Sequence, residues 1–150
     1  MNPINWGYKM ENELQLRHWL AEQLSPPITI QWIEPGRYGS SIGAADCNVK
    51  CGLVLVSLEL KIWETTKKGV KCKMRPVQRR WHHVSMRKGQ RTAVLASVGN
   101  YIILVRGDHV PLRDYAIDKN SGVEDGELIF VSIFMDLDRY LFDESYGFWL

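Results

Sequence analysis

Hydrophobic and polar positions are ordered most clearly in residues 53–63, LVLVSLELKIW. Apolar residues dominate this stretch and neither Gly nor Pro interrupts it, which predicts a strand near the middle of a sheet. Because residues two apart on a strand share a face, Ser57, Glu59 and Lys61 lie together, opposite the branched apolar residues. Burying a carboxylate and an ammonium is costly unless they are paired, so we expect chemistry on this face.

The rest of the pattern predicts helices and strands around this central strand. Apolar residues recur at helical spacing over residues 9–24, and Ser25-Pro26-Pro27 ends that helix. Further strands are expected over 28–34, 44–50, 92–98 and 101–106, and a second helix is expected from Pro76 to Gly89. Residues 63–73 either break the sheet or extend the strand as a ribbon, whereas 127–142 suits a strand and a short helix. The expected fold class is α/β (α+β).

Length and composition indicate one domain over residues 1–150, with the composition of an ordinary globular protein. The chain is 45% hydrophobic and 24% charged. It has neither an apolar run of about 18 residues, which a membrane helix needs, nor the apolar core of a signal peptide near its start. Three cysteines without paired spacing suit a reduced setting. We therefore expect no membrane partner and a cytoplasmic location, in a bacterial or phage-infected cell.

Charge is distributed unevenly along the chain although its net value is only +2. Residues 65–107 hold eleven Lys or Arg and no Asp or Glu, whereas residues 108–150 hold ten acidic and three basic residues. A basic block beside the central strand favours a polyanionic partner, although solvated surface charges are the alternative. The candidate phosphate contacts are Lys67, Lys68, Lys71, Lys73, Arg75, Arg79, Arg80, Arg87 and Lys88.

Two carboxylates are expected to meet at one end of the sheet. Cys51-Gly52 predicts a tight turn between the strands that carry Asp46 and Glu59, so this hairpin brings the two acids side by side. A hard divalent cation relieves their repulsion, and Mg²⁺ binds through one or two carboxylates plus substrate phosphate. Lys61 could orient water or stabilise charge, and the Leu60 carbonyl is a further candidate ligand.

These residues resemble the PD-(D/E)xK nucleases, most closely the VRR-NUC and Holliday-junction-resolvase branch. The resemblance rests on the motifs GAAD (43–46), LELK (58–61) and RPVQ (75–78), and it covers roughly residues 9–107. It implies a restriction-endonuclease-like core, α-β-β-β-α-β with a central mixed sheet flanked by helices. It also implies DNA phosphodiester hydrolysis with Mg²⁺ or Mn²⁺, bound by Asp46 and Glu59, with Lys61 catalytic.

The same resemblance implies supporting residues and leaves two departures. Gln78 matches a supporting glutamine on the helix after the ExK strand, and Glu13, with Glu11 second, matches an acidic residue on the first helix. No Pro stands immediately before Asp46, and residues 108–150 match nothing in the pattern and form an extension of unknown role. Relatives of the resolvase type suggest a homodimer.

The sequence therefore favours a Mg²⁺-dependent, structure-directed endonuclease acting on double-stranded or branched and flapped DNA. One alternative is a non-catalytic DNA- or protein-binding protein on the same fold, and a weaker one is a sequence-specific restriction-like enzyme. A structural reading leaves Glu59 and Lys61 as an edge-strand ion pair, worth little, with Asp46 in a turn. His82 and His83 could act as general bases or, with Cys47 and Cys51, form a zinc site, and Trp81 is expected in the core.

Overall fold

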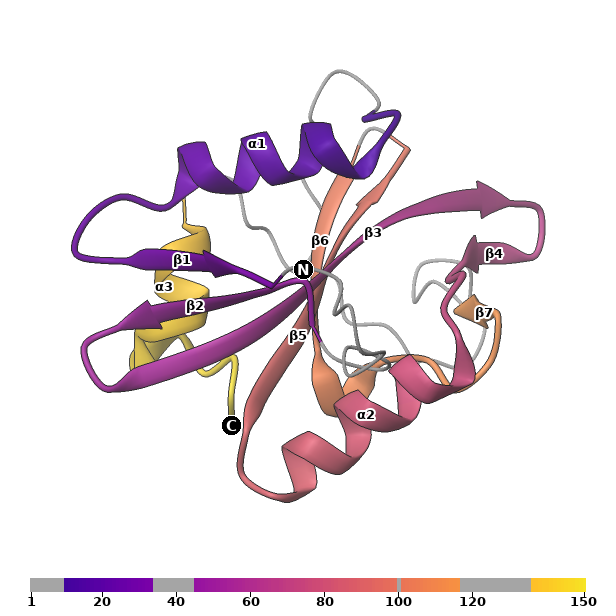
Figure 1. Cartoon of the computed structure of the whole chain (residues 1–150). Helices are drawn as coiled ribbons and strands as arrows, with labels where there is room; N and C mark the ends of the chain where they lie inside the picture. Colours follow the sequence, from indigo (N-terminus) through magenta and orange to yellow (C-terminus); the bar gives the residue numbers. More distant parts are fainter. Residues whose placement is uncertain (1–9, 34–44, 100, 117–135) are drawn as a thin grey trace.

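The computed structural model describes residues 10–33, 45–99, 101–116 and 136–150 (Figure 1). In chain order they form α1 (Glu13–Gln23), β1 (Thr29–Trp32), β2 (Cys47–Cys51), β3 (Val54–Thr66), β4 (Gly69–Lys71), α2 (Pro76–Arg87), β5 (Arg91–Val98), β6 (Tyr101–Arg106), η1 (Gly107–His109), β7 (Tyr115–Ala116), α3 (Leu137–Phe142) and η3 (Glu144–Tyr146). The predicted order α-β-β-β-α-β is therefore present, with β4 inserted after β3.

Strand β3 is the centre of a mixed sheet, as the sequence predicts. It pairs antiparallel with β2 and β4 and parallel with β5, while β1, β6 and β7 extend the sheet beyond β2, β5 and β4. In Figure 1, β3 runs through the middle of the molecule, with α1 and α2 on opposite sides. The prediction of a central mixed sheet flanked by helices is confirmed.

The alternation within β3 separates two apolar clusters. Val56, Leu58 and Leu60 pack on one side with residues of α1 and α3, such as Leu20 and Leu141. A second cluster gathers Trp63, Val94, Ala96 and Val98 with Met74, which precedes α2. Each face of β3 therefore has its own core, and its polar positions lie on the α2 side.

Several boundaries differ from the predicted ones for local reasons. Helix α1 begins at Glu13 rather than near residue 9, because the Asn12 side chain accepts a hydrogen bond from the Gln15 amide (3.0 Å) and caps the helix. Of the two possibilities for residues 63–73, the ribbon is correct. Strand β3 continues to Thr66 and turns back into β4 at Gly69, where φ is 116°.

The end of the chain packs onto the first apolar cluster. Leu137 and Tyr140 of α3 belong to that cluster, and Phe148 and Trp149 pack against it. The Trp149 indole donates to the Leu141 carbonyl (3.0 Å), which fastens the terminal residues to α3. The short helix predicted within 127–142 is α3, whereas the strand predicted before it lies outside the described residues. None of the described helices combines the length and apolar character needed to cross a membrane.

Candidate active site

The register of β2 and β3 brings Asp46 to Glu59. Cys47 pairs with Leu58 at the end of the β2–β3 ladder, so Asp46 stands opposite Glu59. The Asp46 amide donates to the Leu58 carbonyl (2.9 Å), and Asp46 Oδ2 accepts from the Leu60 amide (2.7 Å). Asp46 immediately precedes β2 instead of lying within a strand. Its carboxylate accepts the hydrogen bond of the Leu60 amide, just beyond the last residue pair of the two strands, and this bond holds Asp46 against β3.

Glu59 is a buried carboxylate, with 1% of its surface exposed. Within the described residues, neither of its oxygens accepts a hydrogen bond. The nearest basic atoms are Lys61 Nζ, 3.6 Å from Oε2, and His82 Nε2, 3.4 Å from Oε1. A buried carboxylate without hydrogen bonds costs free energy, so this position is suited to receiving a cation.

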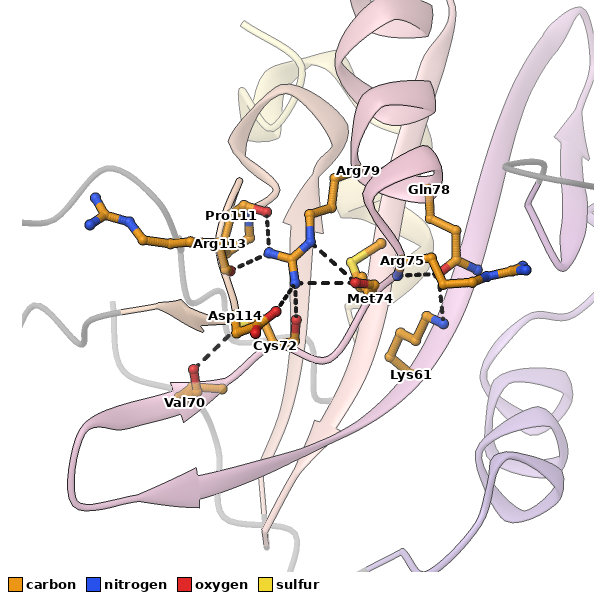
Figure 2. A network of polar contacts seen from close by, with 10 residues as sticks. All are labelled: Lys61, Val70, Cys72, Met74, Arg75, Gln78, Arg79, Pro111, Arg113 and Asp114. Carbon is orange, nitrogen blue, oxygen red and sulfur yellow. Dashed lines mark hydrogen bonds and ion pairs between the residues drawn. The ribbon is translucent and has the colours of Figure 1, made fainter.

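Lys61 is held by the start of α2 (Figure 2). Its Nζ donates to Gln78 Oε1 (3.3 Å), and the same oxygen accepts from the Arg75 amide (3.0 Å). Gln78 caps the helix N-terminus through that second bond, which fixes its amide in place. The Lys61 side chain is 22% exposed, so its ammonium can meet a ligand while its position is set from behind.

The carboxylates also sense one another electrostatically. The pKa of Asp46 is raised, first by burial and then by the Glu59 charge, while the Leu60 amide and Lys61 oppose this rise. The pKa of Glu13 is likewise raised, first by partial desolvation and then by the Asp46 carboxylate. The start of α1 therefore contributes a third acid to the electrostatic field of the site, and the supporting role of Glu13 stays a prediction.

The donor set suits a hard divalent cation that shares its ligands with a substrate. Among the described residues, no three His, Cys, Asp or Glu side chains gather into a ready-made cage. Mg²⁺ commonly takes only one or two protein carboxylates and keeps water or phosphate at its other positions. Asp46 and Glu59, whose oxygens accept no hydrogen bond within the described residues, match that requirement. The Leu60 backbone lies next to Asp46 because its amide donates to Asp46 Oδ2. Whether the Leu60 carbonyl is a ligand stays a prediction.

The zinc alternative does not fit the arrangement of its four residues. Cys47 is fully buried in the apolar cluster shared with α1, and burial raises the pKa of its thiol to about 12. His82 lies on the α2 side of the sheet, and His83 Nε2 contacts the Val110 carbonyl (2.7 Å). All three cysteines are free thiols. The Cys47 thiol and the two imidazoles therefore lie in separate environments and do not form a joint zinc site.

His82 contacts Glu59 from the interior of the protein and not from the solvent side. Its ring is 0% exposed, with Nδ1 2.9 Å from Thr92 Oγ1 and Nε2 facing Glu59. A ring enclosed in this way can hold Glu59 in place but does not reach solvent, so the general-base role fails on geometry. The signal in the sequence is the spacing: His82 lies one helical turn after Gln78, on the same stripe of α2.

The candidate phosphate contacts divide into an exposed majority and one buried exception. The exposed ones are Lys67, Lys68, Lys71, Lys73, Arg75, Arg80, Arg87 and Lys88. Arg79 is only 4% exposed, and its guanidinium donates to the carbonyls of Cys72, Met74, Pro111 and Arg113 and pairs with Asp114 (Figure 2). The prediction for Arg79 is wrong, because this side chain ties α2 to the two segments beside it.

Comparison with known proteins finds similar chains among solved structures. No family model and no curated protein matches the sequence significantly. Among solved structures, the chain is similar to Hjc, a Holliday junction resolvase from the archaeal hyperthermophile Archaeoglobus fulgidus. The TM-score is 0.46 and the identity 12%, over 63% of this chain and 76% of that chain. A likeness at this level does not assign the chain to a family.

Proposed function

We propose that this protein is a divalent-metal-dependent nuclease that hydrolyses DNA phosphodiester bonds, with a preference for branched or flapped DNA. The observation that carries the proposal is that Asp46 lies beside Glu59 of β3. Neither Glu59 oxygen accepts a hydrogen bond within the described residues, and Lys61 Nζ lies 3.6 Å from Glu59 Oε2. This grouping has the chemistry of phosphoryl transfer: an acidic cradle for a cation and one positive charge beside it.

Each residue of the site has a defined role in this proposal. Asp46 and Glu59 hold Mg²⁺ or Mn²⁺, which when bound polarises the phosphate and lowers the pKa of a coordinated water. Lys61, positioned by Gln78, orients the attacking water and stabilises negative charge on the phosphate as the bond breaks. Glu13 adds negative potential at the rim and helps to retain the cation. His82 keeps the buried Glu59 carboxylate in position.

The exposed basic residues supply the affinity for DNA. Lys67 and Lys68 lie at the tip of the β3–β4 ribbon, and Arg75 and Arg80 lie at the start of α2. Contacts from such side chains to phosphates are independent of sequence and weaken steeply with salt. This arrangement favours recognition of DNA shape over sequence readout. The homodimer expected from the resemblance stays a prediction, which sedimentation equilibrium tests.

The deciding experiment compares Glu59→Gln with Glu64→Gln. Both residues lie on β3, but Glu64 is exposed and outside the site. Four-way junction, flapped and linear duplex DNA are incubated with each protein in Mg²⁺, Mn²⁺ or Ca²⁺. We expect Glu59→Gln to abolish cleavage and Glu64→Gln to cleave like the wild type. Cleavage by Glu59→Gln within a few-fold of the wild type would remove the proposed site.

A second variant separates catalysis from binding. Lys61→Ala should lower turnover by about 10²–10³-fold, the range for loss of one group that stabilises transition-state charge, with little change in DNA affinity. Equal loss of turnover and affinity would count against this role. Salt-sensitive binding without cleavage in any metal would support the non-catalytic alternative. A fixed fragment pattern on linear plasmid DNA would support the restriction-like one.

A further inference from the structure

A groove of about 660 Å³ opens beside the proposed active site, on the same face of β2 and β3. Asn48 and Ser57, which line it, are directly paired across the two strands. Glu59 lies two residues after Ser57 on the same face of β3, and Asp46 lies two residues before Asn48, just ahead of β2. Two residues of strand span about 7 Å, so the groove begins about one nucleotide's reach from the two carboxylates.

The groove is lined by apolar side chains and by hydrogen-bonding groups, most of which are neutral. Trp81 belongs to neither apolar cluster of the described residues; it is half-buried and lines the groove, in contrast to its expected place in the core. Leu53, which is fully exposed, and Leu55, which is 50% exposed, also line the groove. Ser57 Oγ donates to Asn48 Oδ1 (2.7 Å), which leaves the Asn48 amide hydrogens as donors.

Charge distinguishes this groove from a second hollow on the described surface. Of the described residues lining the groove, Arg91 is the charged one, and Glu144 (2.6 Å) and the Trp149 ring (5.5 Å) already engage its guanidinium. The second hollow, about 490 Å³, is lined by several charged side chains, among them Arg80, Arg87 and Asp108. The groove with Trp81 suits a neutral, planar group with hydrogen-bonding edges.

We propose that this groove receives an unpaired nucleobase of the DNA strand, one nucleotide from the phosphate that would be cleaved beside Asp46 and Glu59. The proposal rests on the proposed nuclease function and deepens it. Bases freed from a duplex stack on aromatic side chains and hydrogen-bond through their edges, which Trp81, Asn48 and Ser57 provide. The groove has the volume of an ordinary small-ligand site.

The occupant explains why such a nuclease would prefer branched or flapped DNA. Extracting a base from an intact duplex costs a few kcal/mol of pairing and stacking, whereas a base at a flap or branch point is already free. The groove therefore selects substrates that expose an unpaired base beside the scissile phosphate. Selection of this kind needs no contact that reads the sequence.

The test is an abasic scan combined with substitution of Trp81. Flapped DNA is prepared with one abasic nucleotide at successive positions around the branch, and its binding is measured in Ca²⁺ without cleavage. We expect one abasic position to weaken wild-type binding about tenfold, which is the loss for one base stacked on an aromatic ring. Trp81→Ala should weaken binding of intact DNA by about the same factor and lose nothing further at that position. Trp81→Phe should keep most of the affinity.

The opposite results are equally distinct. Equal weakening of intact and abasic DNA by Trp81→Ala, or a scan in which no position matters, would overturn the proposal. If the Trp81→Ala protein does not fold, Leu55→Ala in the groove is compared with Leu14→Ala. Leu14 is an exposed leucine on α1, outside the groove. The groove variant alone should lose sensitivity to the abasic position, and identical behaviour of the two would again overturn it.

The binding readout separates this inference from the nuclease proposal. If the protein shows the Trp81-dependent abasic effect but never cleaves DNA in Mg²⁺ or Mn²⁺, the nuclease proposal fails and the base site stands. If it cleaves branched DNA without that effect, the base site fails and the nuclease proposal stands. Absence of any DNA binding would overturn both.

Discussion

Arg79 and Arg80 are neighbours in the sequence, and the structure gives them opposite consequences. Arg79 is 4% exposed and donates to four backbone carbonyls around the start of α2, whereas Arg80 is exposed. We predict that Arg79→Ala destabilises the fold and that Arg80→Ala weakens DNA binding. Arg79→Lys should be intermediate, because one ammonium cannot reproduce the planar fork that reaches all four carbonyls.

The magnitude for Arg79 follows from its partners. Hydrogen bonds to a charged group contribute about 1.5–3 kcal/mol each, but the partly buried Arg113 carbonyl can regain water when the arginine is removed. Asp114 is 72% exposed, so its ion pair with Arg79 adds at most about 1 kcal/mol. Because buried carbonyls would lose their donor, we expect Arg79→Ala to lower the free energy of unfolding by about 3–5 kcal/mol. For a chain of this size, that corresponds to a fall in Tm of roughly 6–20 °C.

Urea denaturation and salt-dependent DNA binding measure the two effects. Arg80→Ala should change the free energy of unfolding by less than about 0.5 kcal/mol. It should also reduce the slope of log affinity against log salt by about one. The reasoning is refuted if Arg79→Ala costs less than about 1 kcal/mol, or if Arg80→Ala destabilises the fold as much as Arg79→Ala does.

Two further changes test the packing and electrostatics around Glu59. A Cβ at Gly107 would lie 2.0 Å from Thr92 Oγ1, the group that contacts His82, so Gly107→Ala should destabilise the fold by about 1–3 kcal/mol in thermal melts; a melt unchanged from the wild type would contradict this packing. Asp46→Asn should stabilise the metal-free protein at neutral pH. The raised pKa of Asp46 means that the folded state holds this proton more tightly than the unfolded chain, so the ionised form weakens folding. The gain should disappear below the ordinary pKa of 3.8, and a gain that is largest in acid would contradict this sign.

Local rules in the sequence were enough for the central strand, for its hairpin with the preceding strand and for the pairing of the two acids. The alternation in residues 53–63 places Ser57, Glu59 and Lys61 on one face because a strand repeats every two residues. The turn at Gly52, where φ is 61°, fixes the hairpin and therefore the meeting of Asp46 with Glu59. These features depend on neighbours within a few residues or across one tight turn, so they can be predicted without the rest of the fold.

Which faces of a helix become buried was decided only by tertiary packing. Arg79 and Arg80 have the same chemistry and differ by one helical step, and the segments that cover one side of α2 come from residues 72–74 and 111–114. The same packing encloses His82 behind Glu59 and leaves Trp81 at the edge of a groove. The sequence by itself determined the central strand, the hairpin and the basic block, because these follow from short-range periodicity and composition. Only the tertiary structure decided which charges are buried and which can meet a ligand, because burial depends on segments far apart in the chain.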